Sequence, residues 1–135
     1  MLQFYFLSIV CNLFAGYALL AETETKSAFF EGIKSYVLDE TFRLVLGVLT
    51  MIVGLFKILS VIRGDIPVIG DLFPAALGIM SGFALLFEFY KSRSHMSDET
   101  IERLDTLITH YRKWIGFGAV ITAGVHFLFP TVLFL

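Results

Sequence analysis

The sequence predicts an all-α membrane protein, a bundle of four transmembrane helices. Of its 135 residues, 57% are hydrophobic and 16% are charged, and the mean hydropathy is +0.82. A soluble domain of this size is about a quarter charged and buries only about two thirds of its unfolded surface, so it cannot hide this much apolar surface. The apolar residues also fall into four long runs, which lack the alternation of barrel strands.

The four runs are residues 2–21, 42–62, 72–90 and 114–135. At about 1.5 Å rise per residue, a helix of each length crosses a hydrocarbon core of about 30 Å. We expect them to form a single domain, residues 1–135. A secretory signal peptide is the alternative for the first run. However, no Lys or Arg precedes that run, and it is longer than the usual apolar stretch of roughly 7–15 residues.

Lys and Arg are unevenly distributed between the two sides of such a bundle. The connections 22–41 and 91–113, with the adjacent span ends, carry eight of them, whereas the side of the turn 63–71 and both termini carries Lys57 and Arg63. Because cytoplasmic connections are enriched in Lys and Arg, both termini are expected to face away from the cytoplasm. The expected location is the plasma or inner membrane, with the lipid bilayer as the main partner.

Both cytoplasmic connections are predicted to contain amphipathic helices. In 97–113, apolar residues recur at helical spacing, and this helix is expected to continue into the fourth span. The connection 22–41 also places apolar residues on one face. Two positions are open to these helices: on the membrane surface, or packed on the cytoplasmic end of the bundle.

Two stretches of the chain resemble each other. Gly16–Glu22 (GYALLAE) matches Gly82–Glu88 (GFALLFE), and an Asp-Glu-Thr triplet follows in each connection, at 39–41 and 98–100. A parallel two-span internal repeat, with both halves oriented alike in the membrane, would explain these matches. Chance similarity is the alternative, because apolar segments draw on few residue types.

Each span has one face of small and polar residues. Helices in lipid associate through close packing at such faces. Larger apolar residues, Leu85 of the third span among them, are expected to face lipid. The glycines expected at helix contacts are Gly47, Gly54, Gly78, Gly82 and Gly118.

Ionisable residues near the span ends form a first set of candidates, because such groups are expensive to bury in a membrane. They are the ion-pair candidates Lys57, Asp65, Asp71 and Glu88. We interpret them as interfacial anchors. Lys57 is expected to snorkel to the outer surface and pair with one of the aspartates, and Glu88 lies beside Lys91.

His126 lies near the middle of the fourth span, too deep to snorkel. It could relay protons, bind a metal or hydrogen-bond to a neighbouring helix, and we favour the hydrogen bond. No metal site is expected, because His95 and His110 both fall in a connection. The other polar candidates, which could line a pathway with His126, are Asn12, Thr50, Ser81 and Thr122.

The function classes that remain are few. The sequence has no G-x-S-x-G, Walker, Rossmann or paired-cysteine motif, so neither an enzyme nor a cofactor is expected. The net charge of −2 gives no general basic field for a polyanion, so nucleic acid is not expected as a partner. We expect a polytopic membrane protein that acts by assembly, as a homo-oligomer or as an accessory subunit of a membrane complex. The alternative is a transporter or channel for a small solute, ion or proton near His126, and a membrane enzyme acting on lipid or quinone is a third hypothesis.

Overall fold

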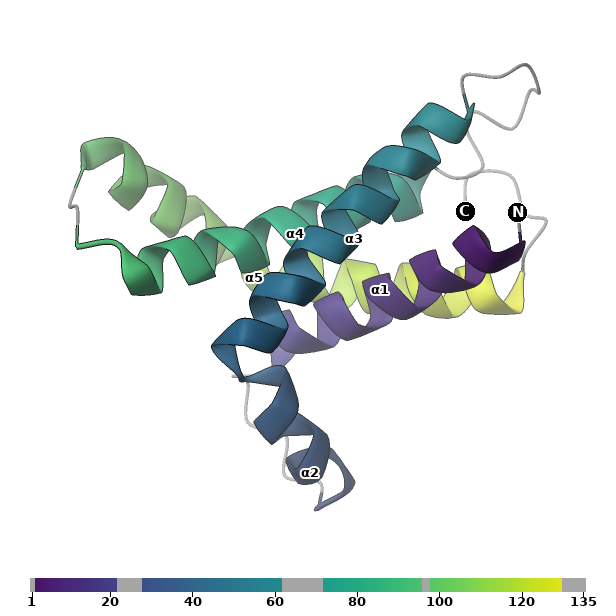
Figure 1. Ribbon diagram of the computed structural model, residues 1–135, viewed down its shortest axis with the longest axis horizontal. Helices are drawn as coiled ribbons and strands as arrows, with labels where there is room; N and C mark the ends of the chain where they lie inside the picture. Colours follow the sequence, from purple (N-terminus) through teal and green to yellow (C-terminus); the bar gives the residue numbers. More distant parts are fainter. Residues whose placement is uncertain (1, 22–27, 62–71, 96–97, 130–135) are drawn as a thin grey trace.

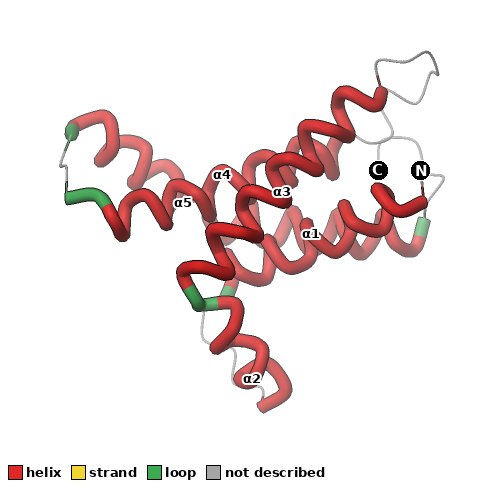
Figure 2. The backbone as a smooth tube through the Cα atoms, in the orientation of Figure 1, coloured by secondary structure: helices red, strands yellow, loops and turns green. Residues whose placement is uncertain are grey.

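The computed structural model describes residues 2–21, 28–61, 72–95 and 98–129, and the elements in these ranges are helices (Figure 2). They are α1 (Leu2–Leu20), α2 (Ala28–Val37), α3 (Glu40–Val61), α4 (Leu72–Arg93) and α5 (Glu99–Leu128) (Figure 1). The predicted all-α fold class is therefore confirmed for the described residues.

Three of the described helices are long and apolar enough to cross a membrane. They are α1, α3 and α4, through the stretches Gln3–Leu20, Glu40–Leu59 and Leu72–Arg93. These helices make the chain compatible with a membrane location. α5 is longer but less apolar, and the predicted fourth span, 114–135, extends beyond the described residues. The turn 63–71, with its candidates Asp65 and Asp71, also lies outside them.

Local sequence signals set where α3 and α5 begin. Asp39 caps α3, since its carboxylate accepts a hydrogen bond from the backbone N–H of Phe42 at 3.0 Å. Asp98 precedes α5 in an extended conformation, and Glu99 and Glu102 lie in the first turn, where negative charge interacts favourably with the helix dipole. α5 then continues for 30 residues without a break. The prediction that the amphipathic segment runs directly into the next apolar run is confirmed.

The helices form two closely packed pairs. α3 packs along α4, and α1 packs along α5, while α1 also contacts α3 and α4 (Figure 1). Glycines permit the close approach within each pair. A Cβ at Gly82 would lie 2.7 Å from the carbonyl oxygen of Gly47, and a Cβ at Gly16 would lie 2.7 Å from the carbonyl oxygen of Gly116. Any larger residue at Gly16 or Gly82 would push two backbones apart.

The other predicted packing glycines differ in the space around them. A Cβ at Gly54 would lie 2.9 Å from a backbone oxygen of α4, and one at Gly118 would lie 3.2 Å from a leucine side chain of α4. Gly78 has more room, because its nearest neighbour is Oδ1 of Asn12 at 3.4 Å. Tight backbone contact therefore applies to Gly54 but not to Gly78.

The apolar core lies where α1, α3 and α4 meet. Leu85 of α4 is fully buried (0% exposed) in the same cluster as Leu19 of α1, so the expectation that Leu85 faces lipid is wrong. The reason is that α1, α3 and α5 all contact α4, so more than the small-residue face of α4 is buried. The other buried members of the cluster are Ala15, Ala18, Ala21, Val37, Leu46 and Ala84.

The two connections that were predicted to be cytoplasmic take different positions. α2 projects at the bottom of Figure 1, with Val37 buried against the core and Tyr36 exposed. The end of α4 and the beginning of α5 project together at the left of Figure 1, where Lys91 Nζ lies 2.6 Å from the carboxylate of Asp105. Each segment thus keeps contact with the chain's own helices while it projects from the bundle, and the choice between the two predicted positions stays a prediction.

Candidate functional site

Polar side chains occupy the interior of the bundle. All five predicted polar-core candidates are buried: Asn12, Thr50, Ser81, Thr122 and His126. They do not gather at one point. The hydroxyls of Thr50 and Ser81 donate to carbonyl oxygens one turn earlier in their own helices, at 2.7 Å and 3.3 Å. Such bonds within a helix satisfy a buried hydroxyl without linking it to a neighbour.

The most unusual contact joins two basic side chains. Nζ of Lys57 on α3 lies 3.0 Å from Nε2 of His126 on α5, and the two residues are only 7% and 2% exposed. Tyr5 of α1 completes the cluster. Its hydroxyl donates to the backbone oxygen of His126, its ring centroid lies 4.5 Å from that of the imidazole, and Lys57 Nζ lies 5.8 Å from the Tyr5 centroid.

The chemistry of this contact limits its charge. An ammonium group has three donors and no acceptor, so a charged Lys57 requires Nε2 of His126 to be an unprotonated acceptor. In that state the imidazole is neutral and carries its proton on Nδ1. An imidazolium beside an ammonium would place two positive charges 3.0 Å apart in a poorly solvated interior. The contact itself therefore fits a charged Lys57 that donates to a neutral His126.

Lys57 is the main departure from the expected site. Its position near the end of the second predicted span favoured snorkelling toward solvent, whereas the structure turns the side chain inward to His126. The predicted partners Asp65 and Asp71 lie outside the described residues. Depth along one helix gives no information about an acceptor on another helix, and Tyr5 was missed for the same reason.

Asn12 of α1 holds a second polar contact between helices. Its Nδ2 donates to the carbonyl oxygen of Pro74 on α4 at 3.2 Å and lies 3.5 Å from Oγ of Ser8. Its Oδ1 is buried and has no hydrogen-bond partner among the described residues. Asn12 therefore keeps acceptor capacity in the interior, beside Gly78 of α4.

A charged layer lies where α1 ends. Glu88 contacts both Arg43 of α3 and Arg112 of α5, at N–O distances of 3.4 Å and 3.2 Å. The two guanidinium groups also donate to the last carbonyl oxygens of α1, those of Ala18 and Leu19, at 2.9 Å and 3.0 Å. Positive charge at a helix C-terminus satisfies both its unpaired carbonyls and its dipole. Glu88 thus anchors two helices, while its expected neighbour Lys91 pairs with Asp105.

The two charged layers are far apart along the bundle. Lys57 follows Arg43 by 14 residues, and His126 follows Arg112 by 14 residues, so about 21 Å of helix separates the layers at 1.5 Å per residue. Leu19, Leu46 and Leu85, all buried, lie between them. An apolar layer therefore isolates Lys57 and His126 from the arginines.

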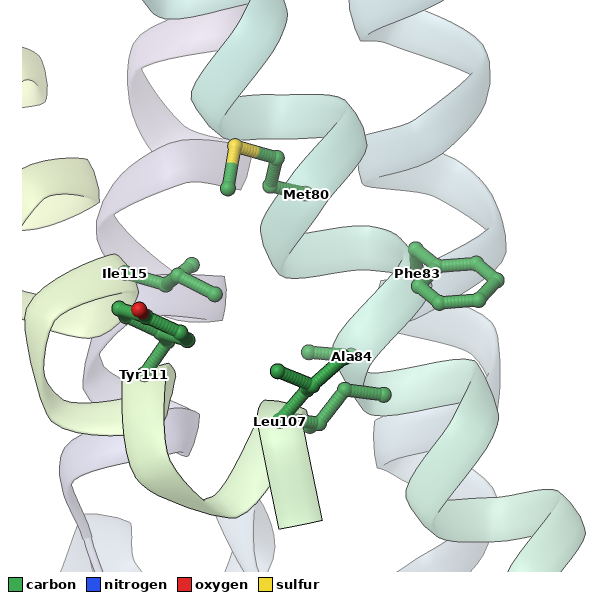
Figure 3. A pocket seen from close by; sticks show the side chains of 7 residues that line it. Met80, Phe83, Ala84, Leu107, Tyr111 and Ile115 are labelled. Carbon is green, nitrogen blue, oxygen red and sulfur yellow. The ribbon is translucent and has the colours of Figure 1, made fainter. Parts of the chain in front are cut away.

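The described residues contain no group of three or more His, Cys, Asp or Glu that could hold a metal ion. They do contain an open apolar groove of about 190 Å³ between α4 and α5, shown in Figure 3. The groove is lined by Met80, Phe83, Ala84, Leu107, Ile108, Tyr111 and Ile115.

These features define a class: a protein whose described residues form helices, three of them able to cross a membrane, around a buried cluster of basic and aromatic side chains. A protein-family model that carries no functional description matches residues 1–126, and the chain belongs to this family. The chain is 30% identical to an uncharacterized protein of Treponema pallidum (strain Nichols) over 136 positions, which cover the full length of both chains. No solved structure shows significant similarity.

Proposed function

We propose that this protein is a four-span transporter that carries protons, or a small solute together with protons, through its polar interior. The observation behind the proposal is the buried contact between Lys57 of α3, a helix able to cross a membrane, and His126 of α5. Ionisable groups in such a position are expensive and are typical of proton relays and substrate sites. Histidine is also the side chain that most readily exchanges a proton near neutral pH.

The proposed membrane arrangement has four spans, with the fourth at 114–135 and both termini away from the cytoplasm. Large apolar side chains of α5 support the fourth span, because Phe117, Ile121 and Leu128 are all more than half exposed alongside α1. The Arg43–Arg112 layer would then lie at the cytoplasmic end. Single cysteines at Arg103 and Phe129, in a Cys11→Ala background, should react with a membrane-impermeant maleimide from opposite sides. Labelling of both from one side would refute the fourth span.

The buried polar groups suggest a route for protons that an apolar layer closes toward the cytoplasmic end. From the Lys57–His126 pair, the polar interior continues to Asn12 and Thr50, which flank Gly78. The layer of Leu19, Leu46 and Leu85 then separates these groups from Arg43. Because Lys57 and His126 are themselves buried, transport would require a conformation that exposes the pair, and passage to the cytoplasmic side would require the leucine layer to open.

The proposal is tested by proton flux into liposomes that contain the purified protein and a pH-sensitive dye. With an imposed membrane potential, we expect faster acidification than in empty liposomes. His126→Gln should abolish the flux, because an amide does not titrate. The matched control is His110→Gln, which alters an exposed histidine and should keep the flux. Wild-type liposomes no faster than empty ones, over a range of pH and added solutes, would refute transport.

Assembly is the second candidate function, and the apolar groove between α4 and α5 favours it. The small-residue faces that suggested assembly are packed within the chain, so a partner would need another surface. The groove is open and apolar, and Leu107 at its edge is more than half exposed. A helix from a second copy or another subunit could pack there. Light scattering of the detergent-solubilised protein should then show an oligomer that Leu107→Ser dissociates.

A further inference from the structure

The first and second halves of the chain bury equivalent positions. If α4 is aligned with α1 at an offset of 66 residues, which is the offset of the repeated heptapeptides, seven buried residues of α1 coincide with seven buried residues of α4. The pairs include Ser8 with Pro74, Ala15 with Ser81, Ala18 with Ala84, and Leu19 with Leu85. The similarity therefore extends to packing and is not confined to composition.

The second helix of each half follows the same rule at an offset of 69 residues, because the second connection is three residues longer. Arg43 then coincides with Arg112, and both donate to the end of α1 and contact Glu88. Further along the helices, the buried residues Gly47, Thr50, Val53, Gly54 and Lys57 coincide with Gly116, Ala119, Thr122, Ala123 and His126, which are also buried.

The contacts between the two halves are also equivalent when α1 is exchanged with α4 and α3 with α5. Gly82 of α4 crosses Gly47 of α3, and Gly16 of α1 crosses Gly116 of α5, with the same 2.7 Å approach of a Cβ to the carbonyl oxygen. Exchanging α1 with α4 and α3 with α5 thus converts one crossing into the other. An exchange that restores itself when applied twice is a two-fold rotation, and equal orientation of the halves places its axis along the bundle.

We infer that the chain is a fused pair of two-span units related by a pseudo-two-fold axis, and that Lys57 and His126 are one position in two copies, meeting on this axis as a single proton-binding site. The shared proton lies on Nζ of Lys57 and is donated to Nε2 of His126, which is the neutral Nδ1–H tautomer. In this arrangement the positive charge of the contact lies on Lys57, and a second charge on His126 would lie 3.0 Å from it.

Three of the described helices contribute side chains to this site. α1 contributes the hydroxyl and ring of Tyr5, α3 contributes Lys57 and α5 contributes His126. α4 has no titratable side chain from Leu72 to Phe87. The charged residues Arg63, Asp65 and Asp71 belong to the turn outside the described residues.

The first experiment exchanges the two side chains in the full-length protein. Because the axis makes the positions equivalent, the double variant Lys57→His/His126→Lys should rebuild the contact and melt within about 2 °C of the wild type. His126→Lys alone, which places two amines face to face, should melt markedly lower. A double variant that is no more stable than this single variant would overturn the inference.

The second experiment uses the wild-type chain and does not depend on a variant folding. In the protein labelled with ¹⁵N at histidine, nuclear magnetic resonance at neutral pH should show His126 as the neutral Nδ1–H tautomer, with Nε2 as an acceptor whose signal shifts in Lys57→Met. A doubly protonated imidazolium at this pH would overturn the inference. Since both experiments measure binding and fold, a protein without proton flux that passes them would refute transport and leave the site intact.

Discussion

Gly82 offers the sharpest test of the packing, because the space around its missing side chain is known. A Cβ at this position would lie 2.7 Å from the Gly47 oxygen and 2.8 Å from the backbone nitrogen of Met51. Both are backbone atoms that no rotamer change can move. For ordinary van der Waals contact, α3 and α4 would have to separate by about half an ångström or more.

The size of the effect follows from a comparison with a second glycine. Overpacking of this kind costs about 1–3 kcal/mol, whereas replacing glycine by alanine within a helix gains up to about 1 kcal/mol. Gly124 of α5 has nothing within 4 Å of its Cβ position. Gly124→Ala should therefore gain the helix propensity of alanine without overpacking. Gly82→Ala should therefore be about 1–3 kcal/mol less stable than Gly124→Ala, with Gly78→Ala close to Gly124→Ala.

The single cysteine provides the assay. Cys11 is buried and is the only thiol in the chain, so a thiol-reactive fluorophore should report unfolding of the detergent-solubilised protein. The predicted difference corresponds to a melting temperature about 3–10 °C lower for Gly82→Ala than for Gly124→Ala. If the two variants melt within a degree of each other, α3 and α4 are not in backbone contact at Gly82.

The same melting assay checks three further predictions. Leu19→Ala and Leu85→Ala remove equivalent core side chains, so each should lower stability by about 2–5 kcal/mol, whereas Leu55→Ala, at an exposed position, should have little effect. If Leu85→Ala left the stability unchanged, Leu85 would face lipid and the burial seen in the structure would be contradicted. Glu88→Gln leaves Arg43 and Arg112 without their shared carboxylate, so it should destabilise more than Glu99→Gln, which breaks an exposed pair worth about 0–1 kcal/mol; equal effects would contradict the anchoring role of Glu88. His126→Gln should keep the fold because its amide oxygen accepts from Lys57, while His126→Leu leaves a buried donor unsatisfied and should cost about 1–3 kcal/mol. Similar stability of these two variants would show that the contact does not stabilise the protein.

Much of the fold could be predicted from the sequence, because a lipid bilayer restricts the length and composition of the helices that cross it. Apolar runs of membrane length predicted α1, α3 and α4, and helical spacing in 97–113 predicted the long continuous α5. Gly47 and Gly82, which lie on the small-residue faces of two predicted spans, contact each other in the structure. The error at Leu85 arose because a periodic pattern identifies one packing face, whereas three helices surround α4.

The candidate site could be predicted from the sequence only in part. His126 could be selected from its depth alone, but its partner lies 69 residues away on another helix, and local rules directed Lys57 toward solvent. A signal for the pair was nevertheless present. Continuing the alignment of the two halves beyond the heptapeptides, with three residues inserted in the second connection, places Arg43 on Arg112 and Lys57 on His126. An internal repeat therefore carries information about contacts across its axis.

Fusion of two equivalent units has a chemical consequence at this site. In a symmetric dimer of identical chains, a residue on the two-fold axis meets its own copy. Two lysines would then face each other as like charges, and two histidines would lack the strong donor that an ammonium provides. Within one chain the two positions are free to differ, so a donor can stand opposite an acceptor, as Lys57 stands opposite His126. The close approaches at Gly16 and Gly82 and the buried leucines Leu19 and Leu85 are common to both halves, so the pseudo-two-fold packing is retained. At the position of Lys57 and His126 the halves differ, and this difference places a donor opposite an acceptor.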